Sequence, residues 1–189
     1  MTNYAASVPC TTDALKGFDR VKVDPGQTSF FEGREFRTFK ELSISSGGSY
    51  TLKAVVPNDI ILTGLAVEVE TGQLRVATVV GGTPAGTYGE TLPIFPRNNM
   101  SVGPNRRANV APEVVITAGG THTGGTELDV LRVKTALNQG VSFSSSVGSA
   151  AGDERGVGAN TYHFRLVAAV GDPVVGVIRV SWEERRPIA

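Results

Sequence analysis

The sequence predicts an all-β protein, a jelly-roll-like β-sandwich with an extended N-terminal arm. Short stretches of alternating apolar and polar residues recur along the chain, which is the pattern of strands with one buried face. Glycine-rich turns separate these stretches at the spacing typical of sandwiches and barrels. No long amphipathic helix is indicated. We therefore expect an arm over residues 1–28 and one β-sandwich domain over residues 29–189.

The first 28 residues show no sustained hydrophobic period. Pro9 and the Asp24-Pro25-Gly26 turn interrupt the segment, and Val21 and Val23 are its one candidate strand. A short helix beginning at Thr12 or Asp13 is the alternative, because these residues cap helix N-termini. We expect this segment to form an arm outside the domain.

The first strands of the domain are predicted over residues 36–44, 50–56 and 60–70. Ser45-Ser46-Gly47-Gly48 joins the first two, and its glycine pair favours a hairpin. Thr71-Gly72 predicts a second hairpin, which would place Glu68 and Glu70 opposite Arg75 on a solvated face. Opposite charges across such a hairpin contribute about 0.2–1 kcal/mol.

Two further strands are predicted near the C-terminus. From Tyr162 onward large apolar residues share one face, while His163 and Arg165 share the other. After a turn at Gly171-Asp172-Pro173, the last strand places Trp182 among apolar residues, so we expect Trp182 in the core.

Two long stretches rich in glycine, serine, threonine and proline are predicted loops, over residues 81–89 and 142–158. Loops of that length in a compact domain are often functional or are ordered by a neighbour. The repeated Gly-Gly-Thr near residues 81 and 119 is interpreted as recurrent turn chemistry.

Composition argues against several classes of partner. The 18 Lys and Arg are matched by 18 Asp and Glu, so the chain lacks the basic excess of a nucleic-acid binder. Cys10 is the single cysteine and has no internal disulfide partner, which favours synthesis in a reducing compartment. The apolar stretches are too short to span a bilayer, and the first residues do not resemble a signal peptide. We expect no nucleic-acid or membrane partner and synthesis in a cytoplasm.

Residues for catalysis or metal binding are scarce. His122 and His163 are the two imidazoles, and we expect each to be structural or solvated. One cysteine and two distant histidines do not make a zinc site. Glu183 and Glu184 point to opposite faces of a strand and so cannot act as a catalytic pair. The sequence therefore predicts no catalytic residue, no metal ligand and no cofactor.

One aromatic and charged run has two interpretations. It contains Phe30, Phe31, Arg34, Phe36 and Arg37. The first interpretation is a strand with one solvated face. The second is an interface, in which these aromatic and arginine side chains anchor in a neighbouring subunit, because both residue types are enriched at interface centres.

Several stretches together resemble small virion structural proteins of tailed bacteriophages. These are Phe30-Phe31-Glu32-Gly33-Arg34-Glu35-Phe36-Arg37, Pro93-Ile94-Phe95-Pro96-Arg97-Asn98-Asn99-Met100-Ser101, the segment 119–133, Gly152-Asp153-Glu154-Arg155-Gly156, and Trp182-Glu183-Glu184-Arg185. The similarity covers residues 28–186. The Ser144-Ser145-Ser146 and Ala159-Asn160 stretches depart from the pattern of such proteins.

The resemblance implies a non-enzymatic head decoration (cement) protein, which binds the major capsid protein on the outer head lattice as a β-rich homotrimer. It implies a virion location, on the capsid surface rather than the tail, after synthesis in the host bacterial cytoplasm. The alternative is a tail- or fibre-associated sandwich, either an adaptor or a host-glycan-binding module that uses Tyr88, Phe95 and Trp182. A hydrolase is the third and most distant hypothesis.

Overall fold

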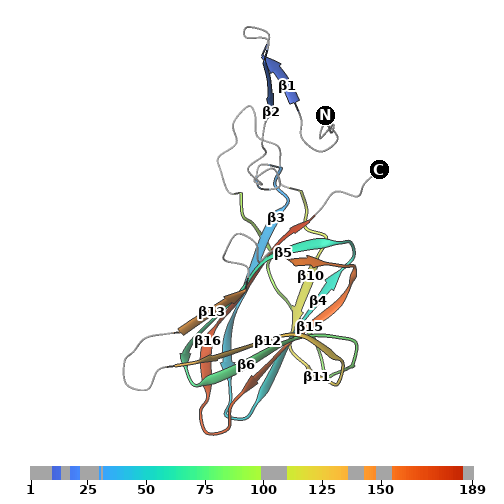
Figure 1. The fold of residues 1–189 in the computed structure, drawn as a ribbon. Helices are drawn as coiled ribbons and strands as arrows, with labels where there is room; N and C mark the ends of the chain where they lie inside the picture. Colours follow the sequence, from blue (N-terminus) through green and yellow to red (C-terminus); the bar gives the residue numbers. More distant parts are fainter. Residues whose placement is uncertain are drawn as a thin grey trace.

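The computed structural model describes residues 10–13, 18–21, 30, 32–98, 110–135, 143–147 and 155–184 of the chain. The elements formed by these residues are all β-strands, which confirms the all-β prediction (Figure 1). Their bounds are β1 Cys10–Asp13, β2 Phe18–Val21, β3 Glu35–Ile44, β4 Ser49–Val56, β5 Ile60–Thr71, β6 Gln73–Val80, β7 Thr83–Ala85, β8 Glu90–Thr91, β9 Phe95–Pro96, β10 Val115–Ala118, β11 Thr121–Thr123, β12 Thr126–Lys134, β13 Phe143–Val147, β14 Arg155–Val157, β15 Asn160–Ala168 and β16 Val174–Glu184.

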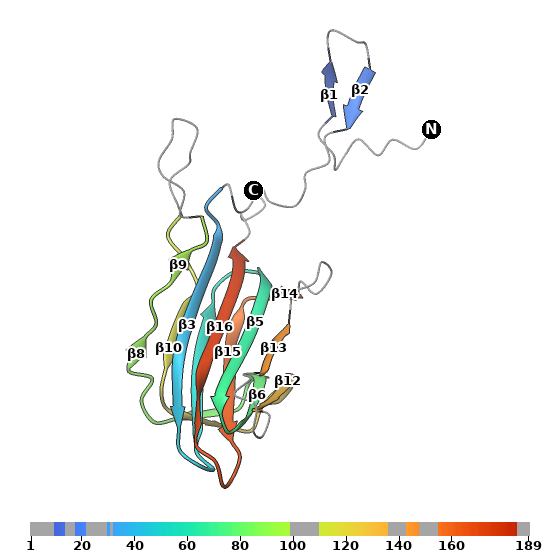
Figure 2. The ribbon, with the colours of Figure 1, turned by 90° about the vertical axis from the view of Figure 1, so that its left-hand side faces the viewer.

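Two antiparallel sheets pack face to face as a sandwich (Figures 1 and 2). The first, here called the β4 sheet, has the strand order β12-β6-β15-β4-β10-β8. The second, here called the β3 sheet, has the order β13-β5-β16-β3-β9, and β14 also pairs with β5. A sandwich of this kind buries the inner face of each sheet against the other.

The tight turns between consecutive long strands cross from one sheet to the other. β3, β5 and β16 lie in the β3 sheet, whereas β4, β6 and β15 lie in the β4 sheet. The two predicted hairpins were therefore wrong, although the turns lie where expected. At Gly72 the turn has φ +82°, and an added Cβ would lie 2.5 Å from the carbonyl oxygen of Pro173. Alternation shows which residues of a strand face the core, but it does not show whether the next strand lies beside or opposite.

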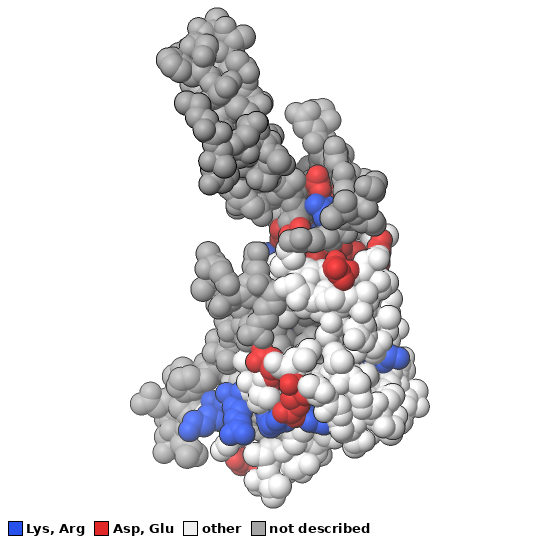
Figure 3. Space-filling view, turned by 45° about the vertical axis from the view of Figure 1, so that its right-hand side comes forward, with Lys and Arg blue, Asp and Glu red and all other residues white. Residues whose placement is uncertain are grey.

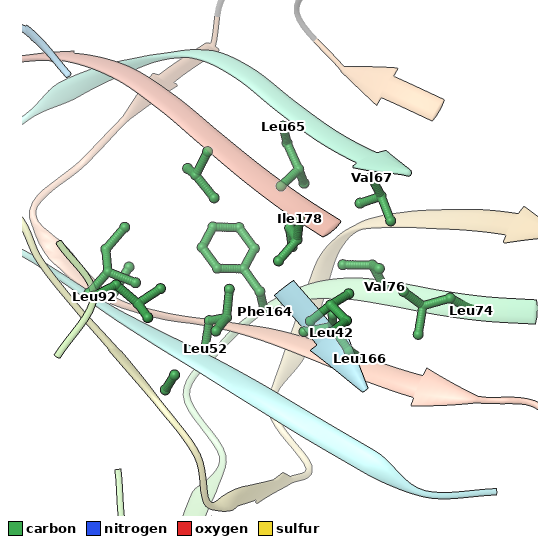
Figure 4. Close-up of a cluster of buried hydrophobic side chains, with 14 of the residues drawn as sticks. Leu42, Leu52, Leu65, Val67, Leu74, Val76, Leu92, Phe164, Leu166 and Ile178 are labelled. Carbon is green, nitrogen blue, oxygen red and sulfur yellow. The ribbon is translucent and has the colours of Figure 1, made fainter. Parts of the chain in front are cut away.

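The hydrophobic core lies between the sheets, where side chains from both inner faces meet (Figure 4). Leu52 and Phe164 come from the β4 sheet, and Leu65 and Ile178 come from the β3 sheet. Each large apolar side chain buried in this way contributes about 1.5–3 kcal/mol. Trp182 is 1% exposed, which confirms the prediction that it belongs to the core.

The two predicted loops contain strands. Within residues 81–89, β7 pairs with β11 to form a separate two-stranded sheet, here called the β7–β11 ribbon. Within residues 142–158, β13 and β14 both pair with β5, and Ser144, Ser145 and Ser146 belong to β13. The prediction of loops was wrong at these strands, because an existing strand can recruit a polar neighbour through its backbone groups without any hydrophobic alternation.

In the predicted arm, β1 pairs with β2 in antiparallel register. Thr12 and Asp13 belong to β1, so a helix does not begin at either residue. The remainder of the first 28 residues lies outside the described residues, and so do Asp153 and Glu154.

Candidate binding surface

The outer face of the β3 sheet presents exposed aromatic rings. Alternation along β3 buries Phe36 and Thr38 and turns Arg37, Phe39 and Glu41 outward. β9 pairs with the start of β3 and places the Phe95 ring on the Phe39 ring, with centroids 5.9 Å apart and planes at 14°. Phe39 remains 46% exposed and Phe95 39% exposed. Apolar area left in water in this way would gain about 25 cal/mol per Å² if a partner covered it.

Arginines surround the two rings. Arg97 forms an ion pair with Glu35 at 3.0 Å, and Arg179 forms one with Glu68 at 2.9 Å. The Arg37 side chain is exposed and forms no hydrogen bond or ion pair with any other residue that the structure describes. Its guanidinium is therefore available to a partner, and five N–H donors make it suited to carboxylates or backbone carbonyls.

The surface is hollowed rather than flat. A shallow open depression of about 750 Å³ is lined by the Phe39 and Phe95 side chains together with Arg37, Val177 and Arg179. Exposed aromatic and arginine side chains around a depression are the composition of a protein interface centre. We call this depression and its rim the Phe39–Phe95 surface.

Four of the five predicted interface residues are described, and the structure separates them. Arg37 lies on the Phe39–Phe95 surface, whereas Phe36 is 1% exposed and its ring packs 6.0 Å from that of Trp182. Phe36 is thus a core residue that a partner cannot reach. Arg34 is largely buried, pairs with Glu32 at 2.6 Å and donates to the backbone carbonyl of Glu184.

Phe30 is half-buried, and its carbonyl oxygen accepts hydrogen bonds from the Gly33 amide and the Asn98 side chain. Phe31 lies outside the described residues. Sequence reasoning did not join Phe39 with Phe95 and did not single out Phe39, although alternation from Arg37 is a signal that would have shown Phe39 to face the same side. The partner ring comes from a distant two-residue strand, for which the sequence carries no periodic signal.

The outer face of the β4 sheet is different, because the β7–β11 ribbon covers part of it. His163 of β15 points outward as predicted, but His122 of β11 stacks on it with ring centroids 4.0 Å apart. The two histidines are 4% and 5% exposed, so they are buried rather than solvated. His122 Nε2 lies 2.8 Å from the carbonyl oxygen of Gly81, and the Tyr88 hydroxyl donates to the carbonyl of Thr121.

Burial in this stack, together with the smaller effects of the nearby His122 and Lys53, lowers the pKa of His163 from its ordinary 6.5 to about 4. His163 is therefore neutral at pH 7. Among the described residues, no three His, Cys, Asp or Glu side chains are grouped so as to hold a metal.

Glu183 and Glu184 occupy opposite faces of β16, as predicted. The Glu184 carboxylate is buried and accepts hydrogen bonds from the amides of Glu113 and Val114 and from the Trp182 indole. It joins the segment before β10 to the last strand, which is a structural use of a buried carboxylate.

The part of the chain that the structure describes contains no helix long and apolar enough to cross a membrane. No family model, curated protein or solved structure matches the chain.

Proposed function

We propose that the protein is a non-enzymatic structural protein of a tailed-bacteriophage virion, a decoration (cement) protein that binds the major capsid protein and stabilises the outer head lattice. The observation that carries this proposal is the Phe39–Phe95 surface. Two stacked rings and Arg37 are exposed on the outer face of the β3 sheet, and none of the described residues covers them. Such a surface gains free energy when a protein partner covers it.

We also infer that the sandwich is a jelly roll. The two sheets have matching strand orders: β3, β16, β5 and β13 follow one another in the β3 sheet as β4, β15, β6 and β12 do in the β4 sheet. Each strand therefore has, at the same place in the other sheet, a strand that is next to it in the chain. In each of these pairs the connecting segment crosses from one sheet to the other. Jelly rolls are common in capsid proteins and in lectins. The fold alone does not choose between these functions, so the choice rests on the surface.

A homotrimer would suit this role. A lattice repeats its binding site at fixed spacing, so a trimer that engages three equivalent sites gains avidity. Each copy can then bind through a modest patch such as the Phe39–Phe95 surface. The trimer itself is tested by light scattering of the purified protein, where a mass of one chain at high concentration would contradict it.

The first experiment measures the copy number of the protein in purified virions of the encoding phage, relative to the major capsid protein, by quantitative mass spectrometry. Decoration predicts a ratio near one, or a simple fraction such as one trimer for each threefold position. A ratio of a few per cent would contradict decoration and assign the protein to the tail. Absence from virions would contradict both locations.

A tail- or fibre-associated adaptor or host-glycan-binding module is the second candidate. It is favoured by the exposure of Phe95, because open aromatic faces also pack against sugar rings. Trp182 is buried and the Tyr88 ring is half-buried, with its centroid 6.2 Å from that of His163, so Phe95 is the most exposed of the three aromatic residues considered for this role. Binding of host surface polysaccharide that is lost in Phe95→Ala, together with a low copy number, would favour this candidate over decoration.

A further inference from the structure

A second feature of the molecule is a cavity of about 290 Å³ inside the sandwich, on the inner side of the β3 sheet, whereas the Phe39–Phe95 surface lies on the outer side. Its walls come from both sheets and are mainly apolar. They include Val56, Ile60, Leu62, Val114, Phe164 and Trp182. Figure 3 shows a hollow in the uncharged surface on one side of the molecule. The cavity opens beside Leu128 and Asp129 of β12 and Gly158, which precedes β15.

Two β-bulges explain why the sheets do not close on each other here. Between β12 and β6 the register shifts at Leu128, which is an extra residue without an opposite partner. Between β5 and β16 the register shifts at Thr63, between the pairs Gly64 with Ser181 and Leu62 with Trp182. A bulge bends its strand and increases the local twist. Both bulges adjoin residues that line the cavity, one in each sheet.

Small residues keep the cavity open. Ala54 faces inward from β4 in a position where its neighbours Leu52 and Val56 are larger, and it lines the cavity wall. Gly156 lies at the opening, and a Cβ added there would meet nothing within 4 Å. Protein interiors are otherwise packed as densely as organic crystals, so a void of this size forfeits many contacts.

The shape and lining select the ligand. An engineered apolar cavity of about 150 Å³ holds benzene, so about 290 Å³ has room for roughly ten carbon atoms. The lining offers few polar groups. The Tyr162 hydroxyl at the opening donates to the carbonyl of Gly158, and Asp129, whose carboxylate accepts a hydrogen bond from the Val130 amide, also lines the opening. A carboxylate at the mouth disfavours an anionic ligand.

We propose that this cavity is a binding site for a medium-chain alkyl compound of about eight to ten carbons, whose neutral polar end remains at the opening near Asp129. The chain packs against aliphatic side chains of both sheets, and its transfer from water supplies the affinity. This proposal does not rest on the proposed function, because the cavity and the Phe39–Phe95 surface are tested separately.

The test is a titration of the full-length protein with 1-octanol, followed by methyl NMR. The expected result is saturable shifts at the methyl groups of Val56, Ile60 and Leu62, and much weaker binding of octanoate at the same site. Saturable binding of octanoate as tight as that of 1-octanol would contradict the assignment of a neutral ligand. Shifts that do not saturate, or that spread evenly over the core, would overturn the site.

Filling the cavity provides the matched comparison. Ala54→Leu is expected to reduce 1-octanol affinity at least tenfold while keeping the melting temperature at or above that of the parent, because the added carbons enter empty space. Ala118→Leu is the control, since Ala118 is 1% exposed in the same sheet but does not line the cavity. It is expected to lower the melting temperature by overpacking and to leave 1-octanol affinity unchanged.

If Ala54→Leu does not fold, Val157→Leu at the half-buried edge of the cavity replaces it. This variant adds one methylene and is expected to reduce affinity two- to fivefold. Unchanged affinity in a folded cavity-filling variant would overturn the proposal.

Discussion

The outer faces of the two sheets arise from the same alternation of residues, but the rings on one face are buried and those on the other are exposed. On the β4 sheet, the β7–β11 ribbon covers His163 with His122, and both rings are buried. On the β3 sheet, the Phe39 and Phe95 rings stack on each other and remain open to solvent. The polar imidazoles are thus hidden and the apolar phenyl rings are exposed, which is the reverse of the usual preference.

The two faces differ in what covers their rings. The histidine stack is completed by the chain itself, so its contribution is to stability. None of the described residues covers the phenyl stack, so a partner molecule that buried these rings would gain free energy from their removal from water. The four predictions below test this division between a self-covered face and an open one.

The most direct effect is expected on binding through the open face. Replacing both Phe39 and Phe95 by alanine should reduce binding to decoration-free heads at least about 30-fold, which corresponds to one hot spot of about 2 kcal/mol. Stability should fall by no more than about 1 kcal/mol, because the rings are already exposed. Sedimentation of protein with heads measures the binding.

Val115→Ser is the matched control, because Val115 is 45% exposed on the outer face of the β4 sheet. It should bind heads like the parent. Equal loss of binding in both variants would contradict the prediction that only the outer face of the β3 sheet binds heads.

The next effect concerns the fit of the ribbon. Gly125 has φ +81°, and an added Cβ would lie 2.6 Å from Val79 Cγ1 and 2.8 Å from the carbonyl oxygen of Gly81. Gly125→Ala should therefore cost about 3–4 kcal/mol, from backbone strain and crowding together. Urea unfolding measures the change in the free energy of unfolding.

Gly81→Ala separates the two causes. Gly81 has φ +69°, but an added Cβ there meets nothing within 4 Å, so strain alone should cost about 1 kcal/mol. Equal losses in the two variants would show that the ribbon is not packed closely on the β4 sheet.

Acid should weaken the covered face. The pKa of His163 is about 4 in the fold and 6.5 in an unfolded chain, so the unfolded state binds the proton more tightly. Its contribution is fully present above pH 6.5 and is lost as the pH falls toward 4, to a total of up to about 3 kcal/mol. Urea unfolding between pH 7 and pH 4 follows this loss.

His163→Phe keeps a flat ring that does not titrate. The difference in the free energy of unfolding between this variant and the parent should therefore change across that pH range. A constant difference would mean that His163 is hydrated and titrates normally.

The smallest effects are expected from surface ion pairs. Arg179→Ala removes the exposed pair with Glu68 and should cost about 0.2–1 kcal/mol, less at high salt. Glu127→Gln on the β4 sheet disturbs two partners, Arg75 and Arg165, so it should cost more than Arg179→Ala. Thermal unfolding of the two variants at low and high salt compares them, and the opposite ranking would contradict this difference.

Period-two alternation made some of the fold predictable from the sequence. It correctly placed β3, β4, β5, β15 and β16, the inward position of Trp182, the outward direction of His163 and the opposed directions of Glu183 and Glu184, but it did not predict β12. These properties depend on neighbours one or two positions away in the chain. The glycine turns were also placed correctly, because Gly47 and Gly72 are needed where φ is positive.

Contacts between distant segments were not predictable. The sequence suggested that Glu68 faces Arg75, but Glu68 pairs with Arg179 and Arg75 pairs with Glu127, because the turn at Gly72 crosses the core. His163 is buried by a ribbon whose strands lie far from it in the sequence. Phe36 was grouped with Arg37 as an interface residue, and the same alternation that exposes Arg37 buries Phe36.

The central claim is that the Phe39–Phe95 surface is the face that a capsid partner covers. Hydroxyl-radical footprinting of the free protein and of the protein on virions tests it directly, because both rings are now open to oxidation. If a capsid partner covers this surface, oxidation of Phe39 and Phe95 falls several-fold on virions, while that of the Leu128 side chain, which is 56% exposed on β12, does not change. Unchanged oxidation of both rings, with protection confined to the β4 sheet, would contradict it.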